Sequence, residues 1–230
     1  MEFRKEIKYL ISNKDFNLIN ESLKTIMKKD EYCNDNFYTI TSIYFDDYNK
    51  TSYNQVLNGI SRRWKYRIRF YNYDDSFIKL EKKYKENNLT NKKDTIITKE
   101  VLYKILNHSI KVVENNDSLL NEFIIKMNTE YLRPVMIIEY DRIPYVYKVG
   151  SVRITLDFNI RYNNRFNDLF NSNKKMYYLK EKILEVKFNE LVPDFIIKRI
   201  GLNTLTETSF SKYLNSVNSF IGGNLNGIKY

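Results

Sequence analysis

The sequence has little cysteine, histidine, glycine or proline, and each shortage excludes a class of protein. The single cysteine, Cys33, excludes an internal disulfide and a zinc site built from several cysteines, so we expect a packed, inert thiol. The only histidine, His108, has no visible partner, which argues against histidine chemistry. With 6 glycines and 3 prolines in 230 residues, no linker interrupts the chain before the C-terminal GGNLNG. We expect one domain over residues 1–220 and a C-terminal tail over residues 221–230.

Long apolar runs are also missing. No run approaches the roughly 18 to 20 residues that span a bilayer, and the start, MEFRKEIKYLIS, is too charged for a signal peptide. We therefore expect no membrane segment in this chain and a cytoplasmic location.

Acidic residues are fewer than basic ones. The chain has 38 Lys and Arg against 28 Asp and Glu, a formal net charge of +10. Such a surplus indicates an anionic partner, which leaves nucleic acid, an acidic membrane and phosphorylated small molecules open. With 43% hydrophobic and 29% charged residues, the composition is that of a globular domain and not of a disordered chain.

Aromatic residues, in contrast, are abundant. The 20 Tyr and 14 Phe concentrate in short runs of alternating polarity, which favours β-strands over helices. Strands are predicted near residues 3–11, 37–46, 61–72, 76–86, 134–142, 144–149, 151–162 and 182–189. Helical patterns are predicted at residues 14–29, 50–58, 98–107, 117–130 and 209–220. The predicted fold class is α+β, mainly antiparallel β.

The charged residues of several predicted strands share one parity, and residues of one parity point to the same face of a strand. In RWKYRIRFY the charged face holds Arg63, Lys65, Arg67 and Arg69, opposite Trp64, Tyr66, Ile68 and Phe70. The corresponding sets in four other strands are Arg4, Glu6 and Lys8; Lys79, Glu81, Lys83 and Lys85; Arg153, Thr155 and Asp157; and Glu185 and Lys187. The opposite faces are apolar and suited to carry helices.

A charged face on one strand is most simply a solvated surface, but its repetition on five strands favours a closed sheet with the charges inside. About eight strands leave an interior of ligand size. Buried charges need compensation by carboxylates, metal, water or an anionic ligand. Because cations exceed acids on these faces, the pattern predicts a polyanion as the ligand.

Eight fragments, in order along nearly the whole chain, resemble the VTC domain, the polyphosphate polymerase catalytic domain of the triphosphate tunnel metalloenzyme (CYTH-like) superfamily. They are RKEIKYLI, TSIYFDD, KYRIRFY, FIKLEKK, RPVMIIEYDR, VRITLDFNIRY, ILEVKF and FSKYLNS. The resemblance implies an eight-stranded closed β-barrel with helices packed outside. It also implies Mn²⁺ or Mg²⁺ as cofactor and ATP and inorganic polyphosphate as partners, without nucleic acid.

Position by position, the resemblance implies catalytic phosphate contacts at Lys8, Arg67, Arg69, Lys83, Arg142, Arg153 and Lys212, further substrate contacts at Tyr140 and Ser211, and a metal ligand at Glu185. Lys65 and Lys187 share the charged faces and are added as substrate-binding residues. The segment ENNLTNKKD departs from the family, which usually has another basic strand there. Either Lys92 or Lys93 can fill that role, and Lys93 is retained as a candidate substrate-binding residue.

Two other functions remain open. A tunnel triphosphatase of the same superfamily carries E-x-E-x-K in the first strand, whereas this chain has Arg4 at the first glutamate position, which favours holding long anions over activating water. A non-catalytic polyphosphate-binding protein needs neither Glu185 nor metal. Glu6 and Glu81 are interpreted as neutralising neighbouring cations. RNA binding is disfavoured because aromatic and basic residues lie on opposite faces.

One pair of carboxylates resembles a metal site but has a simpler interpretation. Asp46 and Asp47 directly precede a predicted helical segment. Aspartate is favoured at turns and at helix N-caps, where its side chain accepts backbone hydrogen bonds. We therefore expect both to be turn or N-cap residues.

Overall fold

The computed structural model describes residues 4–31, 33, 36–87, 89–111 and 117–225. Its strands are β1 (Arg4–Ile11), β2 (Lys28–Lys29), β3 (Tyr38–Asp46), β4 (Arg62–Tyr71), β5 (Ile78–Glu86), β6 (Leu89–Ile97), β7 (Arg133–Tyr147), β8 (Val152–Asn163), β9 (Tyr177–Tyr178) and β10 (Lys182–Phe188). The helices are α1 (Asn13–Ile26), α2 (Thr51–Leu57), α3 (Lys99–Leu106), α4 (Ser118–Thr129), α5 (Asp194–Arg199) and α6 (Lys212–Leu225), with short 3₁₀ turns at Val149–Ser151 and Leu202–Thr204.

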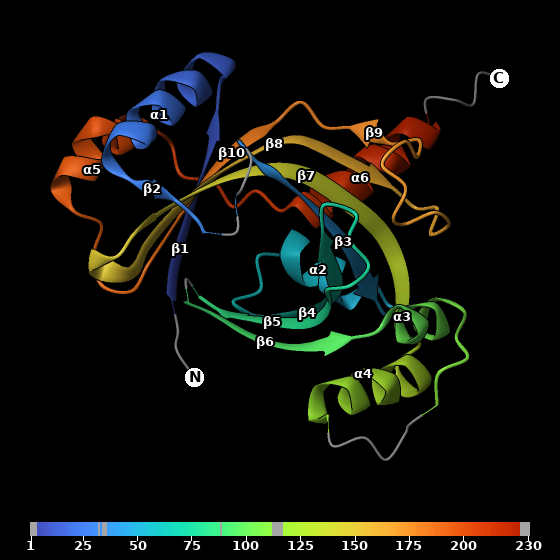
Figure 1. The fold of residues 1–230 in the computed structure, drawn as a ribbon. Coiled ribbons are helices and arrows are strands. Elements are labelled where there is room, and N and C mark those ends of the chain that lie inside the picture. The colour runs from blue at the N-terminus through green and yellow to red at the C-terminus, as the bar shows by residue number, and fades with distance from the viewer. Residues whose placement is uncertain (1–3, 32, 34–35, 88, 112–116, 226–230) are drawn as a thin grey trace.

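Eight antiparallel strands form a ring. The order is β7, β3, β4, β5, β6, β1, β10 and β8, and β8 pairs back with β7 to close it. The short strands β2 and β9 extend β7 and β8 at the margins. In Figure 1 the curved strands are seen around α2. The predicted antiparallel ring of eight strands with outer helices is confirmed.

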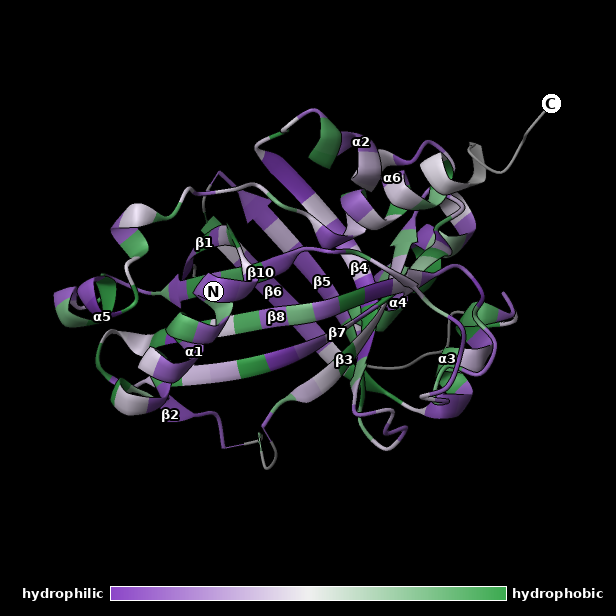
Figure 2. Ribbon diagram, turned by 90° about the horizontal axis from the view of Figure 1, so that it is seen from above, coloured by the Kyte–Doolittle hydropathy of each residue, from purple (hydrophilic) through white to green (hydrophobic). Residues whose placement is uncertain are grey.

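Helices cover the outer faces of the ring. On one side, α1 and α5 pack on apolar side chains of β1, β7, β8 and β10, and on the opposite side α3 and α4 pack on β3, β4 and β5. Purple and green bands alternate along β7 and β8 in Figure 2, because successive side chains point to opposite faces. The predicted apolar outer faces therefore position the charged faces inside.

The inner face is not charged throughout. Inward side chains of β3, β7 and β8, among them Ile40, Ile138 and Ile160, form an apolar cluster with Tyr213 and Val217 of α6. Here α6 covers the inner side of the sheet, whereas the sequence predicted only outer helices. Helices α2 and α6 lie side by side at one opening of the ring (Figure 2).

Asp46 ends β3 and Asp47 follows it in the turn before α2, so both are turn residues as predicted, whereas the N-cap residue of α2 is Lys50. The Asp46 carboxylate accepts hydrogen bonds from the backbone N–H groups of Ser52 (2.8 Å) and Tyr53 (2.9 Å). Asp47 accepts one from Thr51 at 2.9 Å. These bonds satisfy amides that have no partner within the helix. The two carboxylates are therefore occupied by the backbone and, at Asp46, also by the Tyr213 hydroxyl, which donates to it at 2.8 Å.

The strand count of eight is right, but two members differ from the prediction. Residues 134–142 and 144–149 were predicted as separate strands, yet β7 runs without interruption through Pro144. At Pro144 the strand has passed the end of its pairing with β3, so the missing N–H breaks no bond to that neighbour. The eighth strand is β6, which sequence patterning missed because it is polar on both faces.

The last helix is longer than predicted. Helix α6 continues through Gly222 and Gly223 to Leu225, beyond the end of the predicted helical segment at residue 220. The rest of the predicted tail, residues 226–230, lies outside the described residues. Across the described ranges, no helix is long and apolar enough to cross a membrane.

Candidate active site

A cavity of about 140 Å³ lies inside the ring. Most of the predicted site residues line it, namely Lys8, Lys65, Arg67, Arg69, Lys83, Tyr140, Arg142, Glu185, Lys187, Ser211 and Lys212. Most come from the inward positions of β1, β4, β5, β7 and β10, and the last two come from the start of α6 and the residue before it. The alternation of side chains along strands brings these residues together from distant parts of the sequence.

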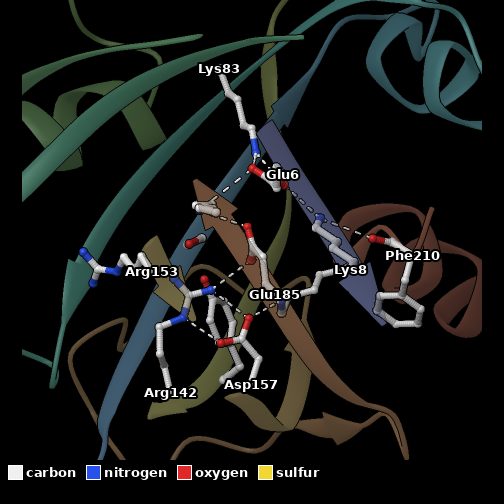
Figure 3. A network of polar contacts seen from close by, with 12 residues as sticks. Glu6, Lys8, Lys83, Arg142, Arg153, Asp157, Glu185 and Phe210 are labelled. Carbon is white, nitrogen blue, oxygen red and sulfur yellow. Dashed lines mark hydrogen bonds and ion pairs between the residues drawn. The ribbon is translucent and has the colours of Figure 1, made fainter. Parts of the chain in front are cut away.

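Arg142, Asp157 and Glu185 form the first ionic cluster of the wall (Figure 3). The Arg142 guanidinium donates two hydrogen bonds to the Asp157 carboxylate, at 2.6 and 2.7 Å, and lies 3.4 Å from Glu185. Lys212 of α6 donates to the same Asp157 at 2.6 Å. Asp157 thus connects the C-terminal helix to the sheet. The Glu185 carboxylate also lies 2.9 Å from the Lys187 ammonium.

Glu6 forms the centre of a second cluster. Its carboxylate lies 2.9 Å from Lys83, 3.4 Å from Lys8 and 3.9 Å from Lys187. Figure 3 shows Lys83 and Lys8 directed toward it from β5 and β1. Burial and Glu185 raise the pKa of Glu6, but Lys83, Lys187 and Lys8 lower it more, so the pKa lies far below its usual value. Glu6 is therefore a carboxylate that compensates several cations, as predicted.

The third cluster belongs to β4, β5 and β6. Arg67 donates to Glu81 at 2.5 Å, and Lys92 lies 3.0 Å from the other oxygen of the same carboxylate. Arg69 instead has neutral partners and donates to Ser42 and Tyr140, both at 3.2 Å. Glu81 therefore neutralises Arg67 and Lys92, which confirms that interpretation, whereas the charge of Arg69 is available to a ligand.

The pKa values of Lys65 and Lys83 lie close to neutral pH. Burial lowers the pKa of Lys65, Tyr44 raises it and the cations Lys83, Lys8 and Arg67 lower it again, to about 7. Burial also lowers the pKa of Lys83, and although Glu6 raises it, the result is about 8. Both ammonium groups lose protons readily, first because they are buried and second because other cations of the cavity lie close to them.

The cavity wall carries a large excess of positive charge. Of the described residues, ten Lys or Arg side chains line the cavity but only two Glu, Glu6 and Glu185. Asp157 and Glu81 lie behind this surface and are already paired with cations. A bound anion with several negative charges would relieve this imbalance.

Comparison with known proteins identifies the family of this chain. The family model of the VTC domain matches residues 3–221. The chain belongs to the VTC domain family. A search of curated proteins finds no match.

Solved structures share the fold of this VTC domain at low identity. An adenylate-cyclase-like protein of Bacillus halodurans is 14% identical with a TM-score of 0.55, covering 90% of this chain and 94% of its own. An adenylyl-cyclase-like protein of Hippeastrum, described as having a dominant triphosphatase activity, is 14% identical with a TM-score of 0.51, covering 97% and 96%. This VTC domain therefore shares its fold with both of these proteins.

Two predicted residues lie away from the cavity of this VTC domain. Arg153 points away from Glu185 (Figure 3), forms an ion pair with Asp30 at 2.7 Å and donates to the Tyr38 hydroxyl at 3.2 Å. Lys93 is exposed on the outer face of β6, opposite Lys82 in the register. Of the two alternatives, the register places Lys92 on the inner face, opposite Lys83 and paired with Glu81.

Sequence reasoning gave no site role to several residues that the VTC fold places at the cavity. Tyr44 of β3 and the segment Thr208–Phe210 line it, and Asp157 supports it from behind. Parity alone places Asp157 on the charged face, but its two cationic partners come from β7 and α6. Tyr44 lies in a strand without charged neighbours of its own parity before Asp46, so no charge pattern marks it.

Proposed function

We propose that this protein is a polyphosphate polymerase, which transfers the γ-phosphate of ATP to a growing inorganic polyphosphate chain inside the tunnel. The observation that supports it most is the composition of the cavity wall, where ten basic side chains face two carboxylates. Such a wall suits a linear anion of high charge density. Phosphoryl transfer needs positioning and electrostatic stabilisation more than covalent chemistry by the protein.

The attacking group in this reaction is the anionic end of the polyphosphate chain, which needs no base to remove a proton. Charge neutralisation is needed instead, because two anions must approach each other. Arg69, Lys65 and Lys8 line the cavity together and would supply it. Of these, Arg69 has only neutral hydrogen-bond partners, so its guanidinium suits direct contact with phosphate oxygens.

A divalent Mn²⁺ or Mg²⁺ ion would be held by Glu185 together with phosphate oxygens of the substrate, and Lys187, which lies 2.9 Å from the Glu185 carboxylate, would have to yield that oxygen to the ion. The described residues contain no cluster of three His, Cys, Asp or Glu side chains that would hold a metal alone. This donor set fits Mg²⁺ or Mn²⁺, which commonly takes one or two carboxylates together with substrate phosphates. When bound, the ion would neutralise charge on the transferring phosphoryl group.

A tunnel triphosphatase is the second candidate, since a structural neighbour from Hippeastrum is described by that activity. Hydrolysis requires an oriented water and a group that accepts its proton. Both cavity glutamates are already bound to cations, and Arg4 occupies the position of a further glutamate in the hydrolase motif. These features favour the polymerase.

The test is incubation of the purified protein with ATP and Mn²⁺ or Mg²⁺, with products separated by gel and by nucleotide chromatography. The proposal expects ADP and long phosphate polymers in metal-dependent amounts. Release of orthophosphate without polymer under either metal would identify a triphosphatase. Binding of polyphosphate without any turnover would identify a non-catalytic binding protein.

A further inference from the structure

Tyr44 is a buried residue of the cavity wall to which the VTC motifs gave no role. It lies on the inner face of β3, opposite Arg67 in the register with β4, and is 4% exposed. The Arg67 Nη1 group donates to the Tyr44 hydroxyl at 3.3 Å. The Lys65 ammonium lies over the Tyr44 ring, 5.4 Å from its centroid. Tyr213 of α6 stacks on the ring at 5.3 Å with an interplanar angle of 19°.

These contacts fix the ring but leave the hydroxyl hydrogen without an acceptor. A phenol both donates and accepts, and Arg67 uses the accepting oxygen. Within the part of the chain that the structure describes, no acceptor for the Tyr44 hydrogen is found. Glu81, an acid of the β4–β6 cluster, already binds Arg67 and Lys92. A buried donor without an acceptor is costly, and an anion in the cavity would satisfy it.

The surrounding charges determine when Tyr44 can donate. Burial raises the pKa of its hydroxyl, but Arg67, Lys65 and Arg69 lower it more, to about 7. An anion that neutralises these cations would reverse that effect and keep the phenol protonated. The hydroxyl is then a donor whenever the cavity holds an anion.

We propose that Tyr44 is a substrate-binding residue, whose hydroxyl donates a hydrogen bond to a phosphate oxygen in the tunnel. This inference rests on the proposed function, because it presumes a phosphate chain in the cavity. The contact gives the tunnel a neutral donor between Arg67 and Lys65. A neutral donor binds an oxyanion without adding to the repulsion among the cations of the empty site.

The experiment compares Tyr44→Phe with the parent protein by calorimetric titration of inorganic tripolyphosphate at pH 7, with a chelator present to remove divalent metal. The substitution keeps the ring, its stack on Tyr213 and its contact with Lys65, and removes only the hydroxyl. A direct hydrogen bond to an anion predicts an affinity lower by about 10-fold or more. Tyr145→Phe is the matched control, because that buried hydroxyl binds Asn20 at 2.8 Å on the outer face of the ring. The control should leave the affinity unchanged.

The same comparison in an Arg67→Lys variant shows whether Tyr44 contacts the anion directly or acts only through Arg67. In Arg67→Lys the cation that faces Glu81 remains, but the guanidinium group that touches Tyr44 is gone. If Tyr44 contacts the anion, Tyr44→Phe still lowers the affinity in this background. If the loss disappears there, Tyr44 only positions Arg67 and the inference is overturned. Equal affinity of parent and Tyr44→Phe also overturns it while leaving the proposed function intact, whereas a parent that binds no tripolyphosphate overturns both.

Discussion

Lys212 and Arg142 meet on one carboxylate, that of Asp157, although they come from the C-terminal helix and from β7. Their donor atoms lie 2.6 Å (Lys212) and 2.6 and 2.7 Å (Arg142) from its oxygens, and the Asp157 side chain has no exposed surface. Burial raises the pKa of Asp157, but Arg142 and Lys212 lower it below its usual value. Asp157 is therefore an ionised carboxylate that fixes the position of two cavity cations.

Asp157→Asn should accordingly lower both stability and activity. The amide keeps the shape but removes the charge that compensates Arg142 and Lys212, and breaking a buried ion pair typically costs about 3 kcal/mol or more. Denaturant unfolding measures the loss. Asp94→Asn is the control, since Asp94 pairs with Lys79 and Lys92 in a more exposed setting and should cost about 1 kcal/mol or less. Equal effects of the two substitutions would contradict the role assigned to Asp157.

Arg67 and Arg69 are neighbours on one face of β4, yet their alanine variants should behave differently. Arg69→Ala removes a cation with neutral partners, so nucleotide and tripolyphosphate binding should weaken by about 10-fold or more while the fold stays intact. Arg67→Ala also leaves the buried Glu81 with Lys92 as its remaining close cation, so the protein should unfold at lower denaturant concentration. Titration calorimetry and unfolding of both variants check the difference. An Arg69→Ala protein with parental affinity would remove this strand from the binding site.

Much of the fold was predictable because charge and apolarity alternate with a period of two. Arg63 to Phe70 shows why: the odd residues line the tunnel and the even ones bury against helices, so the parity of the sequence is enough to assign the two faces. Strand β6 escaped this reasoning because its outward face carries Asn91 and Lys93 instead of a continuous apolar row. The inner position of α6 was also not predictable, because the sequence of an amphipathic helix does not indicate which face of a sheet the helix covers.

The site was predictable to the extent that motifs mark it. Lys8, Arg142 and Glu185 belong to strings that resemble the VTC domain, and the structure brings them to one cavity. The ion-pair and hydrogen-bond partners of each site residue were not predictable, because they depend on the register between strands. Arg153 shows this: its parity points inward, but at its position in β8 it meets Asp30 and Tyr38 instead of the cavity.

Lys92 and Lys93 provide a direct test of the β5–β6 register. Lys92 lies on the inner face beside Glu81 and Asp94, whereas Lys93 lies on the outer face. Lys92→Ala should therefore weaken polyphosphate binding by several-fold and reduce its salt dependence, since one inward-facing cation fewer attracts the anion. Lys93→Ala has the same change in net charge and should bind like the parent. Titrations of both variants at two salt concentrations measure this, and a larger effect of Lys93→Ala would show that the register is shifted by one residue.

Lys65 should make anion binding depend on pH. With a pKa of about 7 in the free protein, Lys65 is largely neutral at pH 8, and it faces Tyr44, Lys83, Lys8 and Arg67. A bound anion favours the ammonium form, so binding takes up a proton and the affinity falls as pH rises above about 7; below that pH Lys65 is protonated in both states and contributes no pH dependence. Lys65→Arg stays charged and should lose this part of the dependence, while the titrations of Tyr44, of Lys83 and of tripolyphosphate itself remain in both proteins. Identical pH profiles from pH 6 to 9 would contradict the prediction.

Glu185→Gln separates catalysis from binding. The substitution keeps the size and hydrogen-bonding capacity of the side chain but removes the charge assigned to metal coordination, so polymer synthesis should fall by roughly 100-fold or more. Metal-free binding of preformed polyphosphate should be at least as tight as in the parent, because the substitution frees Lys187 and Arg142 from a competing carboxylate. Glu86→Gln, which removes an acid paired with the exposed Arg62, is the control and should leave both measurements unchanged. Synthesis measured against Mn²⁺ concentration, together with polyphosphate affinity, tests the assignment. If Glu185 only neutralises Lys187, turnover and metal requirement will match the parent, and the metal must then be held by another group.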